Sequence, residues 1–146
     1  MQPTKPIPVA GGAESRFARR VFLAAVIWGA ISLLPLPFLK SQIEAGVPIG
    51  HPEYFYGFIG VCIAFQLVFF VIARDPVRYR PLMLCAVAEK ALFVVPVLAL
   101  VQAGLAPASL LVFAAADTLL LLLFAWAYVR TAAAPLAGDA AWAIRQ

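Results

Sequence analysis

The chain has 146 residues, of which 64% are apolar and only 12% are charged, and its mean hydropathy is +0.96. Soluble domains carry about 25% charged residues, so this composition excludes an ordinary water-soluble domain. The net charge of +4 does not indicate nucleic acid as a partner, because the basic residues flank apolar runs where membrane topology explains them. About 150 residues is the size of one domain.

Four apolar stretches are long enough to cross a bilayer. A span needs about 20 apolar residues at about 1.5 Å each, and in lipid its backbone must satisfy its own hydrogen bonds as a helix. The stretches cover residues 21–39, 54–73, 81–101 and 108–129. We therefore predict an all-α membrane protein whose transmembrane domain, residues 17–130, is an antiparallel bundle of four helices.

The first stretch follows a polar leader that is long for a signal peptide. Its apolar run also exceeds a usual signal-peptide core, and no clean small-x-small cleavage site follows it. We expect a retained first helix, preceded by a mobile cytoplasmic segment over residues 1–16.

The connections between the later stretches carry turn signals. Residues 51–53, His-Pro-Glu, form a helix-start signal, because proline suits a first helical turn and glutamate suits the positive helix N-terminus. Residues 74–80 contain a proline and predict a tight hairpin. Gly104 and Pro107 predict a short turn, so the last two helices should be antiparallel neighbours.

Lysine and arginine are distributed unequally between the two sides of the predicted membrane domain. One side has only Lys40, whereas the other has Lys5, Arg16, Arg19, Arg20, Arg74, Arg78, Arg80, Arg130 and Arg145. Cytoplasmic loops carry the excess of positive residues. We predict that both termini are cytoplasmic, that residues 131–146 form a cytoplasmic tail, and that the protein is multi-pass in a bacterial-type cytoplasmic (inner) membrane.

Polar and ionisable side chains inside the spans mark the candidate site. They are Gln66 in the second span, Glu89 and Lys90 in the third, and Asp117 in the fourth. Ionisable groups deep in a bilayer cost about 2.5 kcal/mol or more, so they usually face the bundle interior and have partners. Residue counts from the hairpins place Gln66 level with Glu89, and Asp117 about 5 Å from that level.

Helical phase at about 100° per residue indicates what accompanies these groups. The expected companions are Cys85, Phe93 and Pro96 for Glu89; Phe113, Phe124 and Tyr128 for Asp117; and Phe55, Ile59, Cys62 and Phe70 for Gln66. If the faces converge, they form an aromatic-lined site. The predicted ligand-binding residues are Gln66, Glu89, Lys90, Phe93, Phe113 and Asp117.

The charges in this layer do not balance. Phase directs Lys90 away from Glu89. Lys90 can neutralise one of the two acids, with Asp117 as the first candidate, and the other acid then has no obvious partner inside the membrane. A carboxyl group without a partner could hydrogen-bond a neutral ligand or carry a proton. The alternative is that Glu89, Lys90, Asp117 and Gln66 only fix helix pairing, as polar groups between membrane helices often do.

No other pattern indicates a reaction centre. The sequence has no phosphate-binding loop, nucleophile elbow or zinc-ligand spacing. Cys62 and Cys85 fall at different depths of predicted spans and are expected to be small apolar residues rather than a disulfide or metal site. We therefore predict no catalytic residue, metal or cofactor.

A loose resemblance covers most of residues 17–130. Residues 74–83, followed by Glu89 and Lys90 and by Asp117 in the last span, resemble small bacterial four-helix proteins of unknown function. The layout is similar to the DoxX-like membrane proteins, some of which have redox or quinone-linked partners. It is similar in outline to the sterol isomerase and sigma-2 receptor group, whose bundles hold acids facing a lipophilic ligand. The resemblance implies acids facing a cavity.

Three functions are compatible with the sequence. The favoured one is a bundle that binds a lipophilic small molecule, such as a quinone, a sterol-like compound or a lipid, at the acidic layer. The second is a non-catalytic accessory or structural subunit, with a membrane protein or a second copy as partner. The third is a small proton-linked transporter, although the chain has no inverted repeat of broken helices. An enzyme is the least expected reading, because no second catalytic element accompanies the acids.

Overall fold

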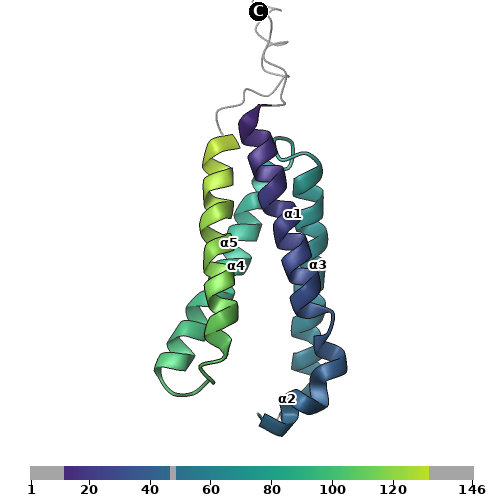
Figure 1. Cartoon of the computed structure of the whole chain (residues 1–146), viewed down its shortest axis with the longest axis vertical. Coiled ribbons are helices and arrows are strands. Elements are labelled where there is room, and N and C mark those ends of the chain that lie inside the picture. The colour runs from purple at the N-terminus through teal and green to yellow at the C-terminus, as the bar shows by residue number, and fades with distance from the viewer. Residues whose placement is uncertain (1–11, 47–48, 132–146) are drawn as a thin grey trace, which may run out of the picture.

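The structure is a computed structural model that describes residues 12–46 and 49–131, and all regular elements within these ranges are helices. In chain order they are α1 (Ala13–Leu33), the 3-10 helix η1 (Leu36–Leu39), α2 (Lys40–Gly46), α3 (Pro52–Arg74), α4 (Arg80–Gln102) and α5 (Leu110–Thr131). The segment containing α1 and the helices α3, α4 and α5 are each long and apolar enough to cross a membrane. The chain is thus an all-α, multi-pass membrane protein of four spans, packed as a bundle (Figure 1).

The helices contain most of the predicted spans. Residues 54–73 and 81–101 lie wholly inside α3 and α4, whereas α5 begins two residues after the predicted start of the fourth span, at Leu110 rather than residue 108. Of the expected N-terminal segment, residues 13–16 already belong to α1. Residues 1–11 of that segment and the tail after residue 131 lie outside the described residues.

The first predicted span, residues 21–39, lies inside the apolar segment that is long enough to cross a membrane, but it is not one continuous α-helix. Helix α1 ends at Leu33, and the chain continues through a turn into η1 and then α2. Pro35 has no backbone N–H to donate to α1 and restricts the residue before it. Its carbonyl instead accepts hydrogen bonds from the N–H groups of Phe38, at 3.0 Å, and Leu39, at 3.1 Å. Pro35 therefore ends α1, and the chain continues as the more tightly wound 3-10 helix η1.

The two hairpins form as their turn residues predict. After α3, the Asp75 side chain accepts a hydrogen bond from the N–H of Arg78 at 3.1 Å, a local turn that ends the helix. After α4, Gly104 has a φ of 72°, which is the left-handed conformation that glycine tolerates best. The N–H groups of Gly104 and Leu105 then close the helix end on the carbonyls of Val101 and Leu100.

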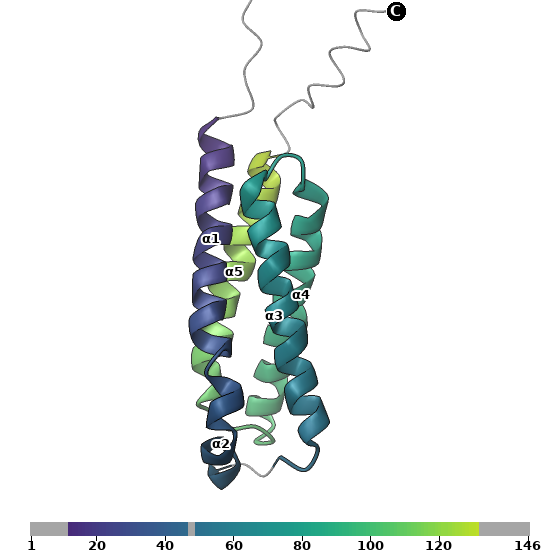
Figure 2. The same ribbon diagram turned by 90° about the vertical axis from the view of Figure 1, so that its right-hand side faces the viewer.

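The bundle consists of two helix pairs. Helix α1 packs along α3, α4 packs along α5, and the pairs meet chiefly between α1 and α5, with fewer contacts between α3 and α4. Figures 1 and 2 show α1, α3, α4 and α5 lying side by side along one common axis, with successive helices running in opposite directions. In Figure 1 the pair α4–α5 diverges from the pair α1–α3 toward the end that carries α2, which we call the α2 end.

The opposite end of the bundle, where α1 begins, is the arginine end. Because α1 and α4 start there and α3 and α5 finish there, it gathers Arg16, Arg19, Arg20, Arg74, Arg78, Arg80 and Arg130. Lys40 lies at the α2 end, where it pairs with Glu44. This asymmetry has the form that the positive-inside rule describes. The cytoplasmic placement of the arginine end stays a prediction.

The buried core lies in the half of the bundle near the arginine end. It is centred on Phe22, Phe69 and Phe124, all fully buried, which we call the aromatic core. The Phe22 and Phe124 rings are stacked with centroids 4.3 Å apart, and Phe69 meets Phe124 edge-on at 5.1 Å. Since these rings come from α1, α3 and α5, the aromatic core joins the two helix pairs.

Candidate functional site

Lys90 is the centre of an ion cluster with Glu89 and Asp117. Its Nζ lies 3.2 Å from Glu89 Oε2 and 3.2 Å from Asp117 Oδ1, and it donates hydrogen bonds to Glu89 Oε1 at 3.4 Å and Asp117 Oδ2 at 3.2 Å. The Lys90 side chain is 7% exposed and each acid is 13% exposed. Because Asp117 belongs to α5 and the other two residues to α4, the ion cluster links these helices.

The prediction that Lys90 points away from Glu89 and neutralises only one of the two acids was wrong. Phase separates the Cβ atoms of adjacent helical residues by about 100°, but it does not fix the far end of a flexible side chain. The Lys90 ammonium group reaches both acids. The predicted agreement in depth between Glu89 and Asp117 is confirmed, because one ammonium group contacts both.

The ion cluster lies directly beside the aromatic core. Lys90 Nζ is 5.4 Å from the centroid of the Phe69 ring, which is within the range of a cation–π contact. The residues of the buried core lie between this level and the arginine end, from Met83 to Ala86 on α4 and from Leu120 to Ala127 on α5. The cluster therefore stands where the tightly packed half of the bundle gives way to the diverging half.

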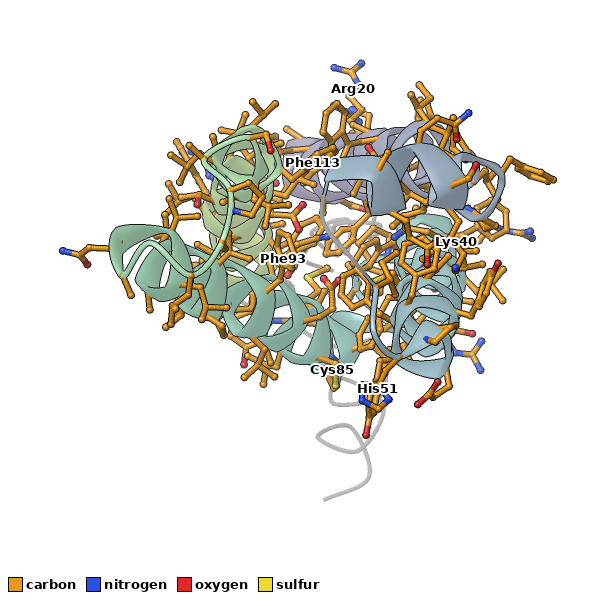
Figure 3. All side chains as sticks on the ribbon, turned by 90° about the horizontal axis from the view of Figure 1, so that it is seen from below. Arg20, Lys40, His51, Cys85, Phe93 and Phe113 are labelled. Carbon is orange, nitrogen blue, oxygen red and sulfur yellow. The ribbon has the colours of Figure 1, made fainter. Side chains whose placement is uncertain are left out.

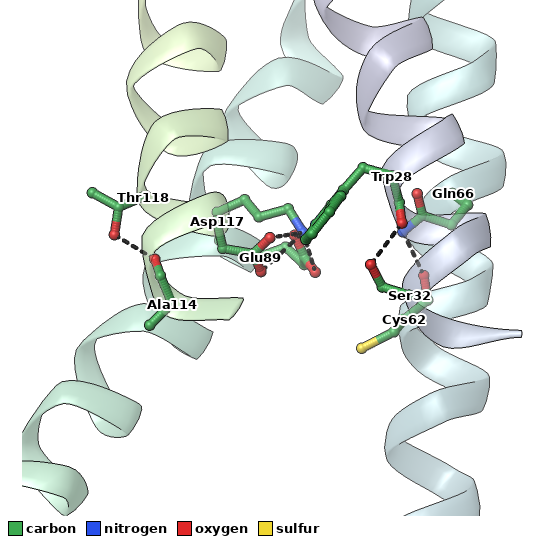
Figure 4. Close-up of polar contacts among 9 residues, drawn as sticks. Trp28, Ser32, Cys62, Gln66, Glu89, Ala114, Asp117 and Thr118 are labelled. Atoms are coloured by element: carbon green, nitrogen blue, oxygen red, sulfur yellow. Dashed lines mark hydrogen bonds and ion pairs between the residues drawn. The ribbon is translucent and has the colours of Figure 1, made fainter. Parts of the chain in front are cut away.

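Helix α1 contributes residues that the sequence analysis did not include. In Figure 4 the Trp28 side chain extends from α1 toward the side of the bundle that carries Glu89 and Asp117. Ser32 lies one turn further along and donates a hydrogen bond to the Trp28 carbonyl at 2.8 Å. Neither residue is ionisable, and the available signal was only a tryptophan and a serine one helical turn apart in the first span.

Gln66 does not join the ion cluster. Its Nε2 donates to the carbonyl of Cys62, one turn earlier on α3, at 3.1 Å. The rest of its amide fills the space that a side chain on Gly29 of α1 would occupy. Among the described residues, the buried Oε1 of Gln66 has no hydrogen-bond partner. Gln66 therefore packs between α1 and α3.

A Gly29→Ala change tests this packing. The added methyl group must displace the Gln66 amide, and the loss of its hydrogen bond to Cys62 costs about 1 kcal/mol. Gly60→Ala on α3 is the matched control, because a Cβ there meets open space. Unfolding in detergent should show Gly29→Ala less stable than Gly60→Ala by about that amount. The difference should vanish in a Gln66→Ala background, and its persistence there would contradict the assignment.

The aromatic companions divide into inner and outer residues. Phe93 is half-buried and stacks on Phe58 of α3, with centroids 6.2 Å apart, so it lies between α3 and α4. Phe113 is 41% exposed. Phe70 is exposed beside Arg74, and Cys85 lies at the outer edge of the bundle (Figure 3). The predicted faces therefore converge only in part, and the prediction that Phe70 and Cys85 line the interior was wrong.

The described residues contain no group of three or more histidine, cysteine or acidic side chains that could hold a metal ion. Both cysteines are free thiols, with Cys62 partly buried and Cys85 exposed. The chemistry of the interior site is thus that of one ammonium group, two carboxyl groups and the aromatic rings around them.

Comparison with known proteins adds no relative. No family model, no curated protein and no solved structure matches this chain. The resemblance drawn from the sequence holds at the level of a small membrane protein with four apolar helices packed as a bundle.

Proposed function

We propose that the protein binds a lipophilic small molecule in its membrane domain, with the ion cluster as the polar end of the site. The observation that carries the proposal is the position of Glu89, Lys90 and Asp117. They lie inside the bundle, next to the aromatic core, and the two helix pairs diverge toward the α2 end (Figure 1). Charged groups inside a membrane domain are costly and commonly mark functional sites.

The surroundings suit an amphiphilic ligand. Phe93 and Trp28 supply aromatic surface near the charged groups, and Trp28 extends toward them from the opposite helix pair. Binding sites for small molecules are mostly apolar, with a few polar groups that fix the orientation of the ligand. A quinone-type, sterol-like or lipid molecule would place its polar head at the ion cluster and its apolar body toward the α2 end.

One observation favours a second candidate, an accessory membrane subunit. Lys90 contacts both acids and joins α4 to α5, as expected of a group that only fixes helix pairing. In that case the ion cluster stabilises the bundle, and partner proteins bind elsewhere on its surface.

The experiment must remove the ion cluster without leaving a charge buried alone. Changing only the two acids would strand the Lys90 ammonium group and destabilise the bundle. The triple variant Glu89→Gln/Lys90→Met/Asp117→Asn replaces all three charges together by neutral groups of similar size. Lys40→Met/Glu44→Gln is the matched control, because it removes an ion pair at the α2 end.

Lipophilic compounds retained by the wild type and both variants should be extracted after gentle purification and identified by mass spectrometry. We expect one compound class at about one molecule per chain in the wild type and in the control. The triple variant should fold, as judged by helicity, and lose it. A folded triple variant that keeps the compound, or a wild type that retains no specific compound, would favour the accessory subunit.

A further inference from the structure

The ion cluster contains more hydrogen-bond acceptors than donors. An ammonium group has three N–H donors, whereas two ionised carboxylates offer four oxygens with about eight lone-pair positions. Among the described residues, Lys90 is the group that donates hydrogen bonds to these oxygens. Glu89 Oε2 illustrates the excess: it is buried and 3.2 Å from Nζ, yet outside hydrogen-bonding geometry with any described group.

The neighbouring polar groups do not correct this imbalance. The Thr118 hydroxyl, close by on α5, donates to the Ala114 carbonyl at 2.7 Å. The Ser32 hydroxyl donates to the Trp28 carbonyl, and the Gln66 amide donates to the Cys62 carbonyl. Among the described residues, none of these three groups donates a hydrogen bond to the ion cluster. The formal charge of the ion cluster, two carboxylates against one ammonium, is also one unit negative.

We infer that the ligand of this site is a lipophilic molecule whose head group donates hydrogen bonds, either a hydroxyl compound or a protonated amine, and that head groups with only acceptors are rejected. The inference rests on the proposed function and specifies its ligand. A donor head group satisfies the surplus carboxylate oxygens, whereas an acceptor-only head group would face them without a partner. Sites built to hydrogen-bond a ligand discriminate strongly against analogues that lack the matching group.

Two pairs of decyl-chain probes separate the features of the head group. A fully substituted decyl-benzoquinone and its hydroquinone share the same body, but only the hydroquinone has hydroxyl donors. Decylammonium and decyltrimethylammonium carry the same charge, but only the first has N–H donors. Binding is measured by equilibrium dialysis between nanodiscs that contain the protein and protein-free nanodiscs of the same lipid, which subtracts partition into the bilayer.

Glu89→Gln is the decisive variant. It changes the buried carboxylate whose Oε2 has no hydrogen bond and removes the surplus charge, while the contacts between Lys90 and Asp117 keep α4 joined to α5. Glu44→Gln at the α2 end makes the same chemical change outside the bundle interior and serves as the control. Helicity and unfolding are recorded for both, so that a loss of fold is distinguished from a loss of selectivity.

In the wild type and in Glu44→Gln, the donor member of at least one pair should bind at least about tenfold more tightly than its partner. Selectivity in the hydroquinone pair alone identifies a neutral hydroxyl ligand, and selectivity in the ammonium pair identifies an amine. In folded Glu89→Gln the ratio of the two affinities within that pair should fall to about threefold or less.

Equal binding within both pairs, or an unchanged affinity ratio in Glu89→Gln, overturns the inference while leaving lipophile binding intact. Binding of none of the four probes counts against the proposed function itself.

Discussion

Replacing Lys90 by methionine should lower the free energy of unfolding by about 3–5 kcal/mol, the largest effect expected of any single change in this chain. Only 6% of the surface of Lys90 is exposed, and its ammonium group is the shared partner of two buried acids. Methionine fills a similar volume but leaves Glu89 and Asp117 facing each other without a cation. Their desolvation and mutual repulsion then oppose folding.

Two further variants show whether the loss comes from stranded charge. Lys40→Met removes a lysine that pairs with Glu44 at the α2 end, and its effect should stay within about 1 kcal/mol. The triple variant Glu89→Gln/Lys90→Met/Asp117→Asn should regain most of the stability, because neutralising a whole buried ion cluster is often tolerated. The measurement is reversible unfolding in mixed detergent micelles, followed by helicity. A Lys90→Met protein as stable as the wild type would show that the ion cluster is not buried as described.

The sequence predicted the elements that depend on local signals. The spans over residues 54–73 and 81–101 follow from the length of apolar runs, and the turns at Asp75 and Gly104 follow from residue types that favour those conformations. The end of α1 at Leu33 was missed, although Pro35 was visible, because the hydropathy of residues 34–39 continues beyond the helix. Apolar length locates a membrane segment, but it does not show where the backbone hydrogen bonds stop.

The sequence predicted the level of Glu89 and Asp117 along the bundle axis, but not the directions in which the side chains of the candidate site point. Counting from the hairpins placed Glu89 and Asp117 at one level correctly, because the rise of a helix is nearly constant. It could not show that Gln66 turns to Gly29 of α1, since no short connection in the sequence indicates that α1 and α3 are neighbours. For the same reason Trp28 was not included, because its relevance depends on α1 lying opposite the pair α4–α5.

The second large effect is expected at the aromatic core, where Phe124→Ala should destabilise the protein by about 2–3 kcal/mol. Phenylalanine to alanine changes in the cores of soluble proteins cost about 3–5 kcal/mol, of which part reflects transfer from water. In a bilayer, a helix that separates from the bundle keeps its side chains in lipid, which is as apolar as the protein interior. The transfer contribution to the cost of Phe124→Ala is therefore largely absent. The remaining cost of Phe124→Ala comes from the cavity that the change leaves and from the lost ring contacts with Phe22 and Phe69.

Phe113→Ala is the matched control for this prediction, because Phe113 lies on the same helix and is 41% exposed. Its removal should cost no more than about 0.5 kcal/mol. Both variants are compared with the wild type by unfolding in the same micelles. If the two changes prove equally costly, contacts of α5 outside the aromatic core stabilise the bundle. If Phe124→Ala alone is costly, the stacked rings hold the two helix pairs together at the arginine end. The helix pairs then diverge beyond a fixed junction, and the ion cluster lies beside that junction.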